Sequence, residues 1–404
     1  MERLYPALAK LFTLADAIVP QALRPGIEAQ DLIRTSRANP SMGAREGLLK
    51  LTDAIKADSK LSFFGQVSQH WDTLRLLRNA QKIEDAHRAN PALAATPISA
   101  PIFILGLPRS GTTFLHGLLA EDADQLVLRH WQTVFPAPRP AGFEPARDWR
   151  VRTAEQQLKV FASLAAGFTE QHQLTADGPQ ECCEITAHVF QSLRFDTTLR
   201  VPSYLRWLNA HGHAEAFAFH KKFLQFLQDG RPARWVLKCP DHTFTLDAIL
   251  QTYPDARFVL VHRDPMAVLG SVAQLTEVVR RPFLKNIDPG EIGAQVSARW
   301  IEGANLLLQF DQRADISPER KIHLHYDALT GVPLASVARI YAQFGLAFSA
   351  EAEAAITRRI EARPRGGYPR HAPYSLDAFK ISVPAVNAQF AAYVRAYCGE
   401  GKGL

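Results

Sequence analysis

The sequence has few cysteines and no long apolar run. Only 4 of its 404 residues are cysteine, at positions 182, 183, 239 and 398, and two of these are adjacent. Such a set is not a disulfide framework, and no Cys/His spacing resembles a zinc site. No window approaches about 18 uninterrupted apolar residues, so no transmembrane helix is predicted. The N-terminal segment contains acidic residues and lacks the apolar stretch of a signal peptide. We therefore expect a cytoplasmic protein.

The sequence also lacks long runs of charge of one sign. Its 46 Lys and Arg residues against 40 Asp and Glu give a formal net charge of +6. The basic residues form only short clusters such as Arg280-Arg281. A nucleic-acid-binding protein usually concentrates its positive charge in a stripe, so no nucleic-acid partner is predicted. A modest positive charge suits a small polyanionic ligand. Oligomerisation remains open.

Two regions differ in their patterning. Residues 1–98 contain amphipathic helical runs separated by breakers such as Pro20 and Pro40, and they carry no motif. They predict a helical N-terminal cap, a substrate lid or a dimer arm. Residues 99–404 alternate short apolar strands with helices, which predicts an α/β domain with a central parallel sheet. The predicted strands are 102–105, 125–128, 234–238, 256–262 and 322–326.

The most informative stretch is residues 101–119. An apolar run at 102–105 has the pattern of a buried parallel strand, and a helical pattern begins at Phe114. The turn between them runs from Gly106 to Thr113 and carries three hydroxyl side chains. Main-chain N–H groups of such a turn and the positive end of the helix dipole converge on one point. The stretch therefore predicts an anion-binding loop.

This loop differs from the P-loop of nucleotide hydrolases at one position. Gly106 and Gly111 match the two glycines of that motif, but Thr112 stands where the motif has lysine. The cation lies inside the loop instead, at Arg109. This arrangement favours an anion with less charge than a triphosphate–metal complex. An ordinary phosphate site and a purely structural turn remain alternatives.

The loop resembles the 5′-phosphosulfate loop of sulfotransferases, which use 3′-phosphoadenosine 5′-phosphosulfate (PAPS) as donor. The matching residues are Pro108, Arg109, Ser110, Gly111, Thr112 and Thr113. The resemblance is to the bacterial branch of the PAPS-dependent sulfotransferase family, which is similar to the tyrosylprotein sulfotransferases. It implies a three-layer α/β P-loop-like fold, with PAPS as co-substrate, PAP as product and no metal.

A second pair supports the resemblance. Arg263 follows the predicted strand 256–262, at the end where parallel sheets place ligands, and Ser271 lies two turns into the next helix. In sulfotransferases an Arg and a Ser at this spacing bind the 3′-phosphate of PAPS. An arginine fork binds a phosphate through two parallel hydrogen bonds, and the hydroxyl adds a third. A surface ion pair is the structural alternative for Arg263.

Further residues are assigned by the resemblance alone. Lys238 ends a predicted strand and matches a lysine that assists leaving-group departure, where a fixed cation stabilises developing charge. Tyr326 matches a tyrosine near the adenine, with a core tyrosine as the alternative. Arg365 and Gly366 resemble a degraded form of a loop that contacts the 3′-phosphate, because the expected lysine is missing.

The general base is less clear. Transfer to a hydroxyl needs a group that accepts its proton, and the family uses a His or a Glu. His130 matches the base position of the tyrosylprotein branch, whereas Glu181 lies in an acidic motif typical of the bacterial branch and is slightly favoured. His242 is a third candidate. Gln132 stands where related sequences often have glutamate, and an amide cannot act as a base.

These observations predict a sulfotransferase that moves a sulfonate from PAPS to the hydroxyl of a small apolar alcohol, a phenol or a similar acceptor. Two alternatives remain open. A P-loop kinase-like transferase would require a lysine in the loop and Mg²⁺, and Thr112 argues against it. A non-catalytic PAP- or phosphate-binding protein would need no base, and Gln132 is compatible with it.

Overall fold

The structure is a computed structural model that describes residues 4–140, 142–171, 174–231, 233–362 and 375–399. It divides into two compact units. The first comprises Met1–Pro97, Leu128–Arg231 and Leu275–Ile287, and the second comprises Ile98–Val127, Pro232–Gln274 and Asp288–Leu404. The N-terminal helices thus share a unit with later segments, and the division into a 1–98 cap and a 99–404 domain stays a prediction.

The second unit is built on a five-stranded parallel sheet in the order β2-β3-β1-β4-β5. The parallel sheet predicted from the sequence is confirmed. One strand is shorter than expected, since the predicted strand 125–128 forms ladder pairs only at Gln125–Leu126. The strands are β1 (Ile102–Gly106), β2 (Gln125–Leu126), β3 (Arg234–Lys238), β4 (Arg257–His262) and β5 (Lys321–His325).

One face of this sheet is covered by α6, α18 and α19. Ile102 and Ile104 of β1 point to this face and lie in one buried apolar cluster with Leu115, Ile340 and Ile356, from the three helices respectively. Every residue of β1 is buried, as its continuous apolar sequence predicts. These helices are α6 (Thr112–Leu119), α18 (Pro333–Gln343) and α19 (Ala350–Glu361).

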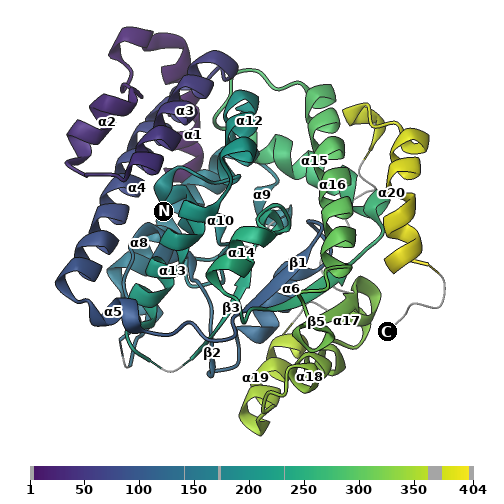
Figure 1. The fold of residues 1–404 in the computed structure, drawn as a ribbon. Coiled ribbons are helices and arrows are strands. Elements are labelled where there is room, and N and C mark those ends of the chain that lie inside the picture. Colours follow the sequence, from purple (N-terminus) through teal and green to yellow (C-terminus); the bar gives the residue numbers. More distant parts are fainter. Residues whose placement is uncertain (1–3, 141, 172–173, 232, 363–374, 400–404) are drawn as a thin grey trace. The chain divides into compact units, whose positions relative to one another are not determined.

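Aromatic side chains fill the opposite face. Because side chains alternate along a strand, Phe103 of β1 points away from Ile102 and stacks on Phe258 of β4 at a centroid distance of 6.0 Å. Phe310 of α16 packs edge-on against Phe258 at 4.8 Å. The sheet therefore lies between two helical layers, which confirms the predicted three-layer α/β fold. The other helices of this unit are α14 (Leu246–Thr252), α16 (Pro289–Asp311), α17 (Tyr326–Gly331) and α20 (Val383–Tyr397), which packs on α16 (Figure 1).

The strand order fixes where a ligand site can form. From the central strand β1 the chain goes first to β2 and β3 on one side, and later to β4 and β5 on the other. The order therefore reverses between β1 and β4, which pair directly in register with Gly106 opposite Val261. In open α/β sheets, ligands bind beyond the carboxyl ends of the strands at such a switch point.

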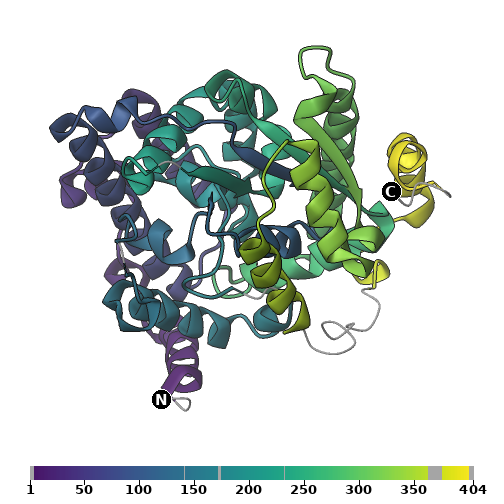
Figure 2. The same ribbon diagram turned by 90° about the horizontal axis from the view of Figure 1, so that it is seen from below.

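The first unit is helical. Its N-terminal helices α1 to α4, drawn in purple and blue, pack together in both views (Figures 1 and 2). The long helix α4 is continuous because no glycine or proline interrupts residues 66–89. The helices are α1 (Leu4–Ile18), α2 (Ala29–Ser36), α3 (Met42–Asp58), α4 (Phe63–Ala89), α5 (Ala92–Ala95), α7 (His130–Val134), α8 (Trp149–Leu164), α9 (Phe168–Gln171), α10 (Cys183–Thr186), α11 (Arg194–Thr198), α12 (Pro202–His211) and α13 (Ala214–Gln228); α15 (Pro265–Arg280) has residues in both units. Within the described ranges, no helix combines the length and apolar character needed to span a membrane.

Candidate active site

The loop between β1 and α6 depends on its two glycines. Gly106 has φ +147° and Gly111 has φ +94°, which L side chains rarely adopt. A Cβ atom on Gly106 would lie 2.4 Å from the carbonyl oxygen of Val261, and one on Gly111 would lie 3.2 Å from the ring of Tyr326. Arg109 also has a positive φ, of 64°. The loop is therefore a tight turn in which the chain passes close to β4 and α17.

The start of α6 offers main-chain donors. Gly111 is the N-cap residue and has no side chain that could accept from the first helical N–H groups. The neighbouring Ser110 is fully buried, and its hydroxyl donates to the carbonyl of Leu107 at 2.6 Å. This bond stabilises the turn itself. Uncapped N–H groups at the positive end of a helix dipole are suited to an anion, and anion binding by this loop stays a prediction.

The structure brings four predicted residues together beside the loop. Nε of Arg109 donates to Oγ of Ser271 at 3.0 Å, and Nη1 of Arg263 donates to the carbonyl oxygen of Arg109 at 2.7 Å. The guanidinium carbon of Arg263 lies 4.0 Å from the ring centre of Tyr326, in cation–π contact. The strand predicted through 326 ends at His325, and Tyr326 is the first residue of α17. Arg109, Arg263 and Tyr326 follow the carboxyl ends of β1, β4 and β5, and Ser271 lies in α15.

Lys238 lies on the other side of β1. It is the last residue of β3, is only 2% exposed, and donates from Nζ to Oγ1 of Thr113 at 3.1 Å. Thr113 is in the first turn of α6, so the ammonium group is held next to the loop. Pro108 and Thr112 are at the loop and at the start of α6. Arg365 and Gly366 fall outside the described residues.

His242 is part of the core of the second unit. It is 2% exposed, and its ring meets that of Phe103 edge-on at a centroid distance of 5.1 Å. Phe103 belongs to the aromatic face of the sheet described above. The environment of His242 is therefore that of a packed core residue.

The other two base candidates lie in the first unit and are close to each other. Arg129 and Pro179 form an antiparallel bridge, which brings the segment containing His130 beside the segment 176–181. Nδ1 of His130 lies 2.8 Å from Nε2 of Gln180, and Oε1 of Gln180 accepts from the main-chain N–H of Glu181 at 2.8 Å. One amide side chain thus joins the two candidates. Both candidates are half-buried.

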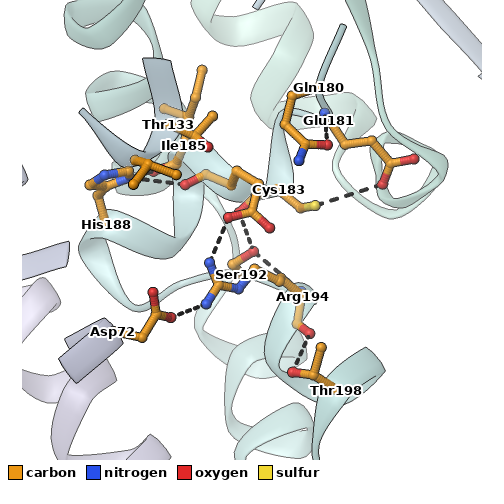
Figure 3. A network of polar contacts seen from close by, with 12 residues as sticks. Asp72, Thr133, Gln180, Glu181, Cys183, Ile185, His188, Ser192, Arg194 and Thr198 are labelled. Atoms are coloured by element: carbon orange, nitrogen blue, oxygen red, sulfur yellow. Dashed lines mark hydrogen bonds and ion pairs between the residues drawn. The ribbon is translucent and has the colours of Figure 1, made fainter. Parts of the chain in front are cut away.

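A half-buried ion-pair network lies at the turn that follows Glu181 (Figure 3). Arg194 pairs with Asp72 and, at 2.6 Å, with Glu184. Ser192 donates to the carbonyl of Cys183 at 2.7 Å. Burial by itself would raise the pKa of Asp72, but the charges of Arg194 and Arg75 outweigh it, so this pKa lies well below its usual value.

No sequence pattern pointed to the pairing of Arg194 with Asp72, because the two residues are 122 positions apart and belong to no motif. Gln132, in contrast, has a structural explanation. It is 4% exposed, and its Oε1 accepts from the N–H of Arg129 at 3.1 Å, which caps α7. Its Nε2 donates to the carbonyl of Ala137 at 3.0 Å.

A five-stranded parallel sheet between two helical layers, with a glycine-bounded loop after its central strand, is the P-loop-like fold found in sulfotransferases. The comparisons agree: the family model described as "Sulfotransferase family" matches residues 101–350, which is more than half of the 404-residue chain. The chain belongs to the sulfotransferase family.

Two solved structures and one characterised relative are similar. Sulfotransferase STF9 from Mycobacterium avium is 27% identical, with a TM-score of 0.83 over 93% of this chain and 97% of that chain. STF1 from Mycobacterium tuberculosis H37Rv is 27% identical, with a TM-score of 0.78 over 90% of this chain and 97% of that chain. The omega-hydroxy-beta-dihydromenaquinone-9 sulfotransferase Stf3 of Mycobacterium tuberculosis is 27% identical over 289 residues, 66% of this chain and 67% of its own length.

Proposed function

We propose that the protein is a cytoplasmic PAPS-dependent sulfotransferase that transfers a sulfonate group to an acceptor hydroxyl by in-line displacement. The contact between Arg109, Ser271 and Arg263 carries this proposal. It joins the loop proposed for the 5′-phosphosulfate to the pair proposed for the 3′-phosphate. A kinase-like nucleotide site does not need a second phosphate-binding pair such as Arg263 and Ser271, because its nucleotide has no 3′-phosphate.

In this proposal the donor is held at several points. The residues from Pro108 to Thr113 bind the 5′-phosphosulfate through main-chain N–H groups and Arg109. Arg263 and Ser271 bind the 3′-phosphate, and Arg365 and Gly366 add contacts to it. Tyr326 meets the adenine with the ring face that is not covered by Arg263.

The transfer step uses two further groups. Lys238 is held beside Thr113. It stabilises the negative charge that develops on the bridging oxygen, between sulfur and phosphorus, as the bond from sulfur to this oxygen breaks. A base takes the acceptor's proton while the new oxygen–sulfur bond forms. Glu181 and His130 are the candidates, since both lie on the segment pair joined by Gln180. His242, which is as buried as Lys238, stays the third candidate.

The acceptor is proposed to be an apolar molecule with a hydroxyl group. The first unit is rich in buried aromatic side chains, including Phe190, Phe195 and Phe217. The relative named for a hydroxylated menaquinone derivative has such a substrate. A hydroxylated prenyl quinone and simple phenols are therefore the first acceptors to test.

Two measurements test the proposal. Thermal unfolding with PAP, AMP and ATP–Mg²⁺ tests the donor site, and PAP is expected to stabilise the protein most. Turnover of radiolabelled PAPS with a panel of apolar alcohols and phenols tests the reaction. Equal stabilisation by PAP and AMP would contradict the roles of Arg263 and Ser271. Stabilisation by PAP without turnover on any acceptor would favour a non-catalytic PAP-binding protein.

A further inference from the structure

The side chain of Gln180 has only one orientation that satisfies both of its neighbours. The main-chain N–H of Glu181 can only donate, so the atom 2.8 Å from it must be the amide oxygen, as observed. The amide nitrogen then faces Nδ1 of His130 at 2.8 Å. A flipped amide would place its NH₂ group against the N–H of Glu181. Gln180 is only 8% exposed, so water has little access to offset such a clash.

This orientation determines where the proton of His130 lies. The amide NH₂ group donates and cannot accept, so Nδ1 of His130 must accept and carries no proton. In a neutral imidazole the proton is then on Nε2. A doubly protonated ring would set an Nδ1–H against the amide N–H. The contact therefore favours one tautomer of the neutral ring and disfavours the imidazolium.

Main-chain bonds hold the two segments in this register. The N–H of His130 donates to the carbonyl of Gly178 at 3.1 Å, and the N–H of Gln180 donates to the carbonyl of Leu128 at 2.7 Å. Arg129 also donates from Nη1 to the carbonyl of Asp177 at 2.9 Å. With both backbones fixed, the amide stays opposite the ring, and rotating the amide would break its bond to the N–H of Glu181.

We propose that Gln180 is a positioning residue that holds His130 as the neutral Nε2–H tautomer, so that His130 donates a hydrogen bond and Glu181 is the general base. The assignment of the base rests on the proposed function. In the transfer step the acceptor oxygen forms its bond to sulfur, and the bond from sulfur to the phosphate oxygen breaks. The hydroxyl proton goes to the carboxylate of Glu181, and PAP leaves with the electron pair of the broken bond.

The tautomer is tested directly by nitrogen-15 NMR of the imidazole side chains in the intact protein. The chain has 14 histidines, so the His130 signals are identified as those missing from His130→Gln. At pH 7.5 the wild-type protein is expected to show a protonated Nε2 and an unprotonated Nδ1. A protonated Nδ1, in either the other tautomer or the imidazolium, would overturn the proposal.

The variant Gln180→Glu sharpens this test. It keeps an oxygen for the N–H of Glu181 but presents a second oxygen, an acceptor, to His130. The proton is therefore expected to move to Nδ1. Gln30→Glu makes the same chemical change on the exposed surface of α2 and should leave the His130 signals unchanged. If Gln180→Glu keeps the wild-type tautomer, Gln180 does not set it.

Turnover of PAPS separates the two roles. Glu181→Gln should lower kcat by about 100-fold or more, the usual effect of losing a general base. His130→Gln, which keeps an N–H donor, should retain about tenfold more activity than His130→Ala. The proposal is wrong about the base if His130→Gln is as inactive as His130→Ala while Glu181→Gln stays active. A protein without any sulfotransferase activity would contradict the proposed function, but the NMR result would still decide the role of Gln180.

Discussion

The guanidinium of Arg263 donates a hydrogen bond from Nη1 to the main-chain carbonyl of Arg109, 2.7 Å away. Arg109 is also the loop residue with a positive φ, of 64°. One side chain from the end of β4 therefore stabilises the loop after β1. The residue proposed to bind the 3′-phosphate thus also holds the loop proposed to bind the 5′-phosphosulfate.

Arg263→Ala should weaken PAP binding. A hydrogen bond to a charged group contributes roughly 1.5–3 kcal/mol, so the Kd of PAP is expected to rise about 10- to 100-fold. AMP lacks the 3′-phosphate and should lose less affinity. Isothermal titration calorimetry with both nucleotides measures the difference, with Arg358→Ala on the exposed surface of α19 as control. An equal loss for PAP and AMP would show that Arg263 acts only through the loop.

Lys238→Met should reduce the rate more than donor binding. The ammonium group is almost fully buried and is held 3.1 Å from Oγ1 of Thr113. Removing a preorganised donor at a site of developing charge lowers kcat by about 100- to 1,000-fold. Single-turnover kinetics measure the rate of transfer, and PAP titration measures donor binding. Lys50→Met, at an exposed position on α3, is the control. A variant with normal kcat would exclude Lys238 from the transfer step.

Gly106→Ala should destabilise the second unit. The added methyl group would lie 2.4 Å from the carbonyl oxygen of Val261, so the loop or β4 must shift. Overpacking of this kind lowers the free energy of unfolding by about 1–3 kcal/mol. Gly345→Ala is a matched control, because Gly345 also has a positive φ, of 59°, but a Cβ atom there meets nothing within 4 Å. Urea unfolding compares the variants, and equal stability of the two would mean that the loop adapts freely.

Stability should fall in acid, and His262 is one of the buried histidines responsible, together with His188 and His220, whose pKa values burial also lowers to about 3. Nδ1 of His262 lies 2.9 Å from the hydroxyl of Tyr393, and Nε2 lies 2.9 Å from Nδ1 of His323. Burial, together with the charge of His323, lowers the pKa of His262 to about 3. The unfolded chain takes up this proton near pH 6.5, whereas the folded chain takes it up only near pH 3. Stability from this group is therefore complete above about pH 6.5 and is lost progressively as the pH falls towards 3.

The pH dependence of the unfolding free energy in a His262 variant measures how much this histidine contributes. One such histidine changes the free energy of unfolding by up to about 1.4 kcal/mol per pH unit. His262→Phe keeps the ring that stacks on Tyr397, at 4.0 Å in the wild type, but cannot titrate. Its unfolding free energy should fall less between pH 6 and pH 4.5 than that of the wild type. His211→Gln, at an exposed position on α12, should behave like the wild type; if His262→Phe does too, the buried histidine does not control acid stability.

The fold was predictable because its signals are local. The apolar run of β1, the two glycines and the position of Arg263 after β4 each predict a local structure, and the rules for parallel sheets bring the strand ends together. The contact of Arg109 with Ser271, 162 positions apart, follows from that arrangement once the sheet is formed. The distance between these two side chains could not be predicted from their spacing in the sequence.

Other features depend on packing that leaves no pattern in the sequence. Arg194 and Asp72 are 122 positions apart and belong to no motif, so their ion pair could not be foreseen. From the sequence, Gln132 was noted only as an amide in place of a possible base, whereas in the structure its side chain caps α7. The sequence did not predict a role for Gln180, because its contact with His130 forms only when two segments about fifty residues apart pair.

Each unit is assembled from three stretches of the chain that alternate along it. During synthesis the first unit lacks its last stretch until Ile287 has left the ribosome, and the sheet lacks β5 until residues 321–325 follow. Neither unit can therefore be expressed alone by cutting the gene once. The proposed donor and acceptor residues are therefore best tested one at a time, by point substitutions in the intact chain of 404 residues.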